Sequence, residues 1–89
     1  MKVDFKESFL RDAKKIRDKT LLAQIKTVIE QVEQAATLQD VGRLKRLSGS
    51  SSSYYRIRVG DYRIGLSVES DVVIFVWCLN RKEIYRYFP

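Results

Sequence analysis

The pattern of apolar and polar residues changes its period twice along the chain. Residues 1–5 alternate between apolar and charged side chains, which is typical of a short β-strand. From residue 6 to residue 36 the period is helical, with a break near residues 18–20, where Thr20 is placed to act as an N-cap. The apolar positions form two stripes, the first made of Phe5, Phe9, Ala13 and Ile16 and the second of Leu21, Leu22, Ile25, Val28, Ile29, Val32 and Ala35. This stretch therefore predicts two antiparallel helices, each with one buried face.

The second half of the chain returns to a strand-like pattern. In residues 37–53 the pattern is weak: Leu44 and Leu47 anchor a connector, and the serine-rich run 48–53 is expected to form a flexible loop. Three strands then follow, at residues 54–59, 62–68 and 72–79, separated by turns at 60–61 and 69–71, and residues 82–89 form a short aromatic tail. The third strand is almost wholly apolar, as expected of a central strand covered on both faces.

These elements together predict one α+β domain over residues 1–89. An N-terminal strand and two antiparallel helices precede a three-stranded antiparallel meander, and the helices pack on one side of the sheet.

The hairpin around Gly60 and Asp61 gathers arginines on one face of this sheet. If these two residues form the loop, Arg58 faces Arg63 and Arg56 faces Gly65, while the apolar side chains of both strands share the opposite face. Like charges directly opposite each other destabilise a sheet by a few tenths to about 1 kcal/mol. An anion bound between the guanidiniums would turn this repulsion into a net attraction, and Gly65 is expected to leave room for it. Arginine suits phosphate because its guanidinium can donate two hydrogen bonds to two phosphate oxygens at once. The alternative is an arginine-rich face kept only for solubility.

A second basic and aromatic cluster follows the third strand. Arg81 emerges at the strand end near the arginine face, and Tyr85 and Tyr87 point to the same side of an extended segment, where they could stack on bases. Tyr87 and Phe88 could instead cap the core, which is the preferred interpretation for Phe88.

Composition narrows the class of partner. The 89 residues include 17 Lys and Arg against 11 Asp and Glu, a net charge of +6 that attracts polyanions such as nucleic acid, an anionic membrane or an acidic protein. A single cysteine, Cys78, excludes an internal disulfide, and no signal peptide or spanning apolar run occurs, so we expect a cytoplasmic protein without a membrane partner. Because the chain has no histidine, it lacks the commonest metal ligand, and we expect no cofactor and no metal ion.

Two segments carry a family resemblance. The run YRIRVGDYRI at residues 55–64, followed by NRKEIYR at residues 80–86, resembles the RelE/ParE toxin superfamily of type II toxin–antitoxin systems. The resemblance covers nearly the whole chain, since the two-helix N-terminal half is also typical of the family. It implies a RelE-like, metal-independent endoribonuclease that enters the ribosomal A site and cuts mRNA, with the 70S ribosome, mRNA and a cognate acidic antitoxin as partners.

The resemblance also implies site residues. Arg56 and Arg58 fall where RelE has two lysines, Arg63 matches its phosphate-binding arginine, Arg81 matches the arginine after the central strand, and Tyr85 matches its C-terminal tyrosine.

Attack of a 2′-hydroxyl on phosphate needs a proton acceptor, a proton donor and cations around the phosphorus. The four arginines can supply the cations but cannot act as a conventional base, which leaves Tyr85 as base or stacking ring, with Lys82 or Glu83 as further candidates. Two other functions stay open: a ParE-like toxin that inhibits DNA gyrase without cutting RNA, and an RNA-binding module without chemistry.

Overall fold

The computed structural model describes residues 1–42, 44–46 and 54–87, with side chains described as far as residue 84. The predicted serine loop, Leu47 and Phe88 lie outside the described residues.

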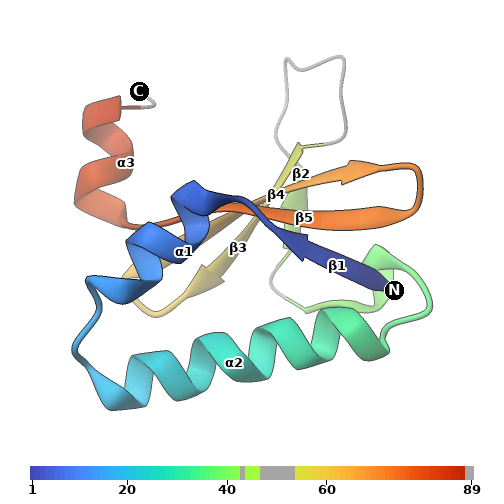
Figure 1. Ribbon diagram of the computed structural model, residues 1–89, viewed down its shortest axis with the longest axis horizontal. Helices are drawn as coiled ribbons and strands as arrows, with labels where there is room; N and C mark the ends of the chain where they lie inside the picture. The colour runs from blue at the N-terminus through green and yellow to red at the C-terminus, as the bar shows by residue number, and fades with distance from the viewer. Residues whose placement is uncertain (43, 47–53, 88–89) are drawn as a thin grey trace.

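The described strands form one mixed five-stranded sheet, in the order β1-β5-β4-β3-β2 (Figure 1). The strands are β1 (Lys2–Phe5), β2 (Leu44–Arg46), β3 (Tyr54–Val59), β4 (Tyr62–Glu69) and β5 (Val72–Asn80). The predicted antiparallel meander is confirmed as β3-β4-β5. The structure adds two edges to it: β1 pairs in parallel with β5, and the short β2 pairs antiparallel with β3. β2 was not predicted, because three residues are too few to show an alternating period.

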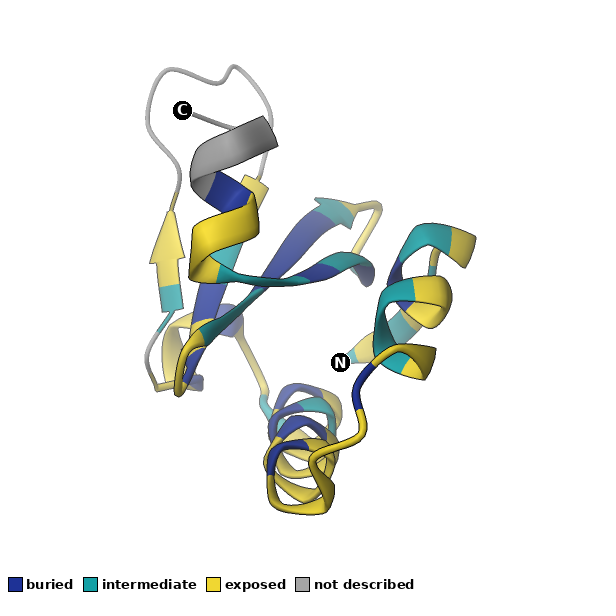
Figure 2. Ribbon diagram, turned by 90° about the vertical axis from the view of Figure 1, so that its left-hand side faces the viewer, coloured by how far each residue is buried: buried dark blue, intermediate teal, exposed yellow. Residues whose placement is uncertain are grey.

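The two predicted helices are confirmed as α1 (Glu7–Lys14) and α2 (Lys19–Gln34). Figure 2 shows both on the same side of the sheet. The expected N-cap of α2 was wrong. Asp18 fills that role, since its carboxylate accepts hydrogen bonds from the backbone N–H groups of Thr20 and Leu21 at 2.9 and 3.2 Å. Leu22 was also placed wrongly on the buried stripe, because it is 37% exposed, whereas Leu21, Ile25, Val28 and Val32 are buried.

The core lies between these helices and the inner face of the sheet. Three phenylalanines join the N-terminal strand, the first helix and the central strand: the ring centroids of Phe5, Phe9 and Phe75 lie 5.2–5.6 Å apart. Aromatic pairs at this spacing contribute about 0.5–1.5 kcal/mol each beyond the area they bury. The cluster fixes α1 against β5, the strand that leads to the candidate site.

A β-bulge interrupts the pairing of β4 with β5. Gly65 pairs with Trp77 but Leu66 pairs with Phe75, so Val76 is the extra residue. Helix α1 satisfies backbone groups at the bulge and just after it: the Ser8 hydroxyl donates to the Val76 carbonyl, and the Asp12 carboxylate accepts from the Cys78 N–H at 3.0 Å. The bulge therefore shifts the side-chain alternation of β5 by one residue.

One consequence of this shift is that Cys78 points into the core, where it is 2% exposed. Burial, reinforced by the nearby Asp12 carboxylate, raises the pKa of the Cys78 thiol to about 12.

The expected extended tail was wrong, because residues 81–87 form a third helix, α3 (Arg81–Tyr87). Its first turn is stabilised by the Asn80 side chain, whose Oδ1 accepts from the Lys82 N–H at 3.0 Å, and Glu83 adds a negative charge near the helix N-terminus. Ile84 is 4% exposed and lies against the face of the sheet opposite α1 and α2. In the part of the chain that the structure describes, no helix is both long and apolar enough to cross a membrane.

Candidate active site

The register of the β3–β4 hairpin is as predicted, with Gly60 and Asp61 as the turn. Arg58 pairs with Arg63 and Arg56 pairs with Gly65. Gly60 adopts a φ of +57°, which favours glycine at the first position of a tight hairpin turn. Since Ile57, Val59 and Ile64 are buried in the core, the arginines lie on the outer face of the sheet, away from α1 and α2.

Two adjoining hollows collect the basic side chains of this face. One, of about 360 Å³, is lined by Lys45, Arg56, Arg58 and Arg63. The other, of about 90 Å³, is lined by Arg56, Arg63, Arg81 and Ile84. Because Arg56 and Arg63 line both, the two hollows form one continuous basic site, made of Lys45, Arg56, Arg58, Arg63 and Arg81. It brings together four of the five residues expected from the sequence.

Lys45 is the one member of the basic site that was not predicted from the sequence. It pairs with Arg56 across the β2–β3 register and therefore shares its face. The only signal in the sequence is the triplet Leu44-Lys45-Arg46, in which the lysine follows an apolar residue.

Backbone contacts position two of the arginines at the hairpin turn. Arg63 donates from Nη1 to the carbonyls of Gly60 and Tyr62, each at 2.9 Å. The backbone N–H of Arg81 donates to the Asp61 carbonyl at 2.8 Å, and its Nε lies 4.0 Å from the Asp61 carboxylate, with both side chains more than half exposed. The turn thus ties the start of α3 to the arginine face, which places Arg81 beside Arg63.

The space over Gly65 is not open for an anion, which corrects the role expected for this glycine. The Trp77 indole lies directly over it, and a Cβ added at residue 65 would overlap the ring atoms Cδ2, Cε2 and Nε1. The absent side chain at Gly65 therefore makes room for Trp77, and the anion site is the neighbouring pair of hollows.

The remaining candidates lie on α3. Lys82 and Glu83 are exposed, and Tyr85 belongs to the helix, but its side chain is outside the described part of the structure. Burial, followed by the charge of Glu83, raises the pKa of Tyr62, whose phenol lies beside the turn.

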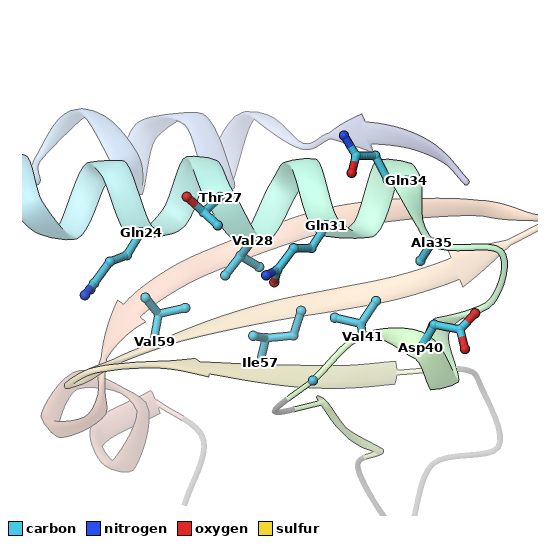
Figure 3. Close-up of a pocket in the computed structure, with 11 residues that line it drawn as sticks. Gln24, Thr27, Val28, Gln31, Gln34, Ala35, Asp40, Val41, Ile57 and Val59 are labelled. Atoms are coloured by element: carbon cyan, nitrogen blue, oxygen red, sulfur yellow. The ribbon is translucent and has the colours of Figure 1, made fainter.

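A third hollow, of about 560 Å³, lies elsewhere, between α2 and β3 (Figure 3). Its apolar lining includes Val28 of α2 and Ile57 and Val59 of β3, and its helical side also carries glutamines of α2. Asp40 is the only charged residue in its lining, so this hollow lacks the cations that a phosphate needs. Among the described residues, no group of three or more His, Cys, Asp and Glu side chains could hold a metal ion.

Comparison with known proteins assigns the family. Residues 3–85 match the sequence profile of the ParE toxin of the type II toxin–antitoxin system parDE. The chain is 42% identical to Toxin RelE3 of Methanocaldococcus jannaschii over 90 residues, covering the full length of both proteins.

Solved structures agree with this relationship. The structure superposes on a chain of the RelB–RelE antitoxin–toxin complex from Methanococcus jannaschii with a TM-score of 0.84 and 38% identity, over 97% of this chain and 99% of that one. It superposes on a chain of the archaeal RelE–RelB complex from Pyrococcus horikoshii OT3 with a TM-score of 0.73 and 19% identity, over 90% and 93% of the two chains. The chain belongs to the RelE/ParE toxin family of type II toxin–antitoxin systems.

Proposed function

We propose that this toxin is a metal-independent endoribonuclease that cleaves mRNA on the ribosome. The observation that carries the proposal is the basic site, in which five cationic side chains from β2, β3, β4 and the start of α3 surround one pair of hollows.

Such a site suits phosphate chemistry. In the proposed reaction the 2′-oxygen of a ribose bonds to the adjacent phosphorus while the bond to the 5′-oxygen of the next nucleotide breaks. The products are a 2′,3′-cyclic phosphate, which water can open, and a 5′-hydroxyl. Negative charge grows on the phosphoryl oxygens in the transition state, so guanidiniums fixed in advance stabilise it more than the ground state. Arg63 and Arg81 are the best placed for this role, because both are held by the hairpin turn. The Arg63 side chain donates to the Gly60 carbonyl, and the Arg81 backbone N–H donates to the Asp61 carbonyl.

The proton transfers are assigned to α3. The 2′-hydroxyl must lose a proton and the leaving oxygen must gain one, and arginine stays protonated. Tyr85 is our candidate for orienting or deprotonating the nucleophile, with Lys82 and Glu83, both exposed on the same helix, as further participants.

Two charge deletions test the arginine roles. We expect Arg63→Ala and Arg81→Ala each to slow single-turnover cleavage on programmed ribosomes by about 10²–10³-fold, the loss typical of removing one contact to a developing oxyanion. Arg46→Ala is the matched control: Arg46 pairs with Tyr55, a residue packed against the core, so it lies on the opposite face of β2 from Lys45. Cleavage at the wild-type rate in both site variants, with unfolding midpoints matched by circular dichroism, would remove them from the mechanism.

Tyr85 calls for a pair of substitutions. Loss of cleavage in both Tyr85→Phe and Tyr85→Ala points to the hydroxyl, whereas loss only in Tyr85→Ala points to stacking on a base. If neither variant changes the single-turnover rate, the tyrosine has no part in the reaction.

A ParE-like toxin that inhibits DNA gyrase is the second candidate, and the match to a profile described as ParE toxin favours it. The two functions separate in parallel assays of the purified protein. The nuclease proposal expects cut mRNA on ribosomes and unchanged supercoiling by gyrase, and the reverse pattern replaces it with the ParE-like function. A protein that binds RNA but affects neither assay is an RNA-binding module.

We further propose a cytoplasmic antitoxin as partner, since the similar chain from Methanococcus jannaschii was crystallised in a RelB–RelE antitoxin–toxin complex. An acidic segment that places carboxylates at the basic site would block phosphate binding without disturbing the core. Opposite charges steer association, so the on-rate with the product of the neighbouring gene should fall steeply with salt in stopped-flow measurements. A salt-independent on-rate contradicts this account of neutralisation.

A further inference from the structure

The single tryptophan of the chain stands on the same face of the sheet as the arginines. Regular alternation after Phe75 would send Trp77 into the core, because Phe75 is itself a core residue. The bulge at Val76 reverses this and turns the indole to the outer face, where the residue is partly exposed. Bulges of this kind often re-aim a side chain beside a functional site.

Further features hold the indole in this place. Gly65, which is buried, allows the ring to lie against the β4 backbone, and a methyl group there would occupy the same space. On the other side of β5, Ser8 and Asp12 of α1 hydrogen-bond to the backbone around the bulge. Packing alone gives little reason to turn the largest apolar side chain of the chain away from its main core.

The indole lies next to the basic site. Gly65 is flanked by Arg56 on β3 and Trp77 on β5, and a ring lying over Gly65 extends toward Arg56. Arg56 and Trp77 stand two strand spacings apart, about 10 Å between their backbones, and the indole covers the intervening Gly65, which shortens the gap between ring and guanidinium. A nucleotide whose phosphate occupies the basic site therefore has an aromatic surface within reach of its base.

We propose that Trp77 is a base-binding residue, on which a nucleobase beside the scissile phosphate of single-stranded RNA stacks. The inference rests on the proposed ribonuclease function and deepens it. Stacking on an aromatic ring accepts any base, since every base has a π-face, so Trp77 adds affinity and alignment without selecting a sequence.

Fluorescence of Trp77 gives a direct test, because no other tryptophan contributes. The probes are two short RNA oligonucleotides in which every 2′-hydroxyl is methylated, so that neither can be cut; one carries its bases and the other is abasic. We expect the base-bearing RNA to quench the tryptophan emission in a saturable way, and the abasic RNA to bind more weakly with little quenching.

Substitutions separate stacking from charge. Trp77→Leu should lower the affinity for the base-bearing RNA by about 5–150-fold, the factor that corresponds to ~1–3 kcal/mol of stacking per base, and leave the salt dependence of binding unchanged. Trp77→Phe should keep most of the affinity. Arg56→Ala should reduce the slope of log K against log salt by about 0.7. Tyr54→Leu is the matched control, since it removes an aromatic ring that is 44% exposed on the same face of β3.

Equal quenching by both RNAs, wild-type affinity in Trp77→Leu, or a larger loss in Tyr54→Leu overturns the proposal. Cleavage on programmed ribosomes distinguishes this failure from failure of the nuclease function. If Trp77→Leu binds and cleaves as the wild type does, the nuclease stands and the base-binding role falls. If the wild type neither cleaves mRNA nor is quenched by RNA, both fall.

Discussion

Replacement of Gly65 by alanine creates a direct steric conflict between two adjacent strands. The new methyl group would fall within the Trp77 indole, closer to three ring atoms than real Cβ atoms approach any neighbour. Either the ring must leave its place over β4 or the two strands must shift apart. Because the ring is large and the neighbouring backbone is hydrogen-bonded, neither change is free of cost.

The size of the effect follows from two opposing contributions. Overpacking of a well-packed site costs about 1–3 kcal/mol. Alanine in a strand is otherwise better than glycine by about 0.5–1 kcal/mol, because it loses less conformational freedom on folding. We therefore expect Gly65→Ala to destabilise the wild type by about 1–2 kcal/mol, a fall in Tm of about 4–16 °C for a domain of this size.

A double-mutant cycle with Trp77→Ala isolates the contact. Without the indole, the methyl group has space, so Gly65→Ala should become neutral or stabilise the fold by about 0.5 kcal/mol in that background. Urea unfolding followed by far-UV circular dichroism suits all four proteins, since two of them lack tryptophan. Additive effects of the two substitutions within about 0.5 kcal/mol, or a wild-type midpoint for Gly65→Ala alone, would refute the close approach described above.

Three further predictions concern stability. Asp18→Ala should cost about 0.5–2 kcal/mol by removing the N-cap of α2, whereas Thr20→Ala should cost less, and equal losses in urea unfolding would contradict the assignment of the cap. Since the folded state raises the pKa of Cys78 to about 12, the unfolded chain loses this proton first as pH rises. Burial of the neutral thiol therefore contributes its full stability below the ordinary thiol pKa of about 8.5, and this contribution declines as the pH rises toward 12. Cys78→Ala should flatten this part of the plot of unfolding free energy against pH, which denaturant titration measures. Ser70 and Asp71 both have positive φ in the β4–β5 turn, a conformation that an Asn-Gly pair suits better. The double substitution Ser70→Asn and Asp71→Gly should therefore stabilise the protein by about 0.5–1 kcal/mol. A lower unfolding midpoint would contradict this.

The sequence was a good guide to the hairpin and a poor one to the central strand. Residues 54–68 alternate cleanly around a glycine turn, so the pairing of Arg58 with Arg63 followed from the period of two. Residues 72–79 are almost all apolar, and such a run carries no sign of which side chain faces which way. The bulge at Val76, and with it the position of Trp77, depends on hydrogen bonds from α1 that only the folded chain reveals.

Side-chain caps at helix starts explain two other differences between the predicted and the observed structure. Asp18 and Asn80 both use a side-chain oxygen to bind backbone N–H groups at a helix start, and each was overlooked in favour of a neighbouring pattern. Asn80 followed by Glu83 is a recognisable helix-start signal, which would have predicted α3 in place of an extended tail. Lys45 was not predicted for a different reason. Strand β2 forms because it pairs with β3, and the three residues of β2 are too few to show a pattern of their own.

The parallel pairing of β1 with β5 has a consequence for the synthesis of this protein. Lys2 lies beside Val72, so the first strand made by the ribosome must wait for 70 more residues before its partner exists. Contacts this distant in sequence are slow to form, because a long loop must close before they stabilise the chain. At translation rates of about 5–20 residues per second, the delay lasts several seconds. Arg81 follows β5, so the basic site is completed last. Under the proposed function, an antitoxin therefore has an interval in which it can meet the nascent chain before the basic site is complete.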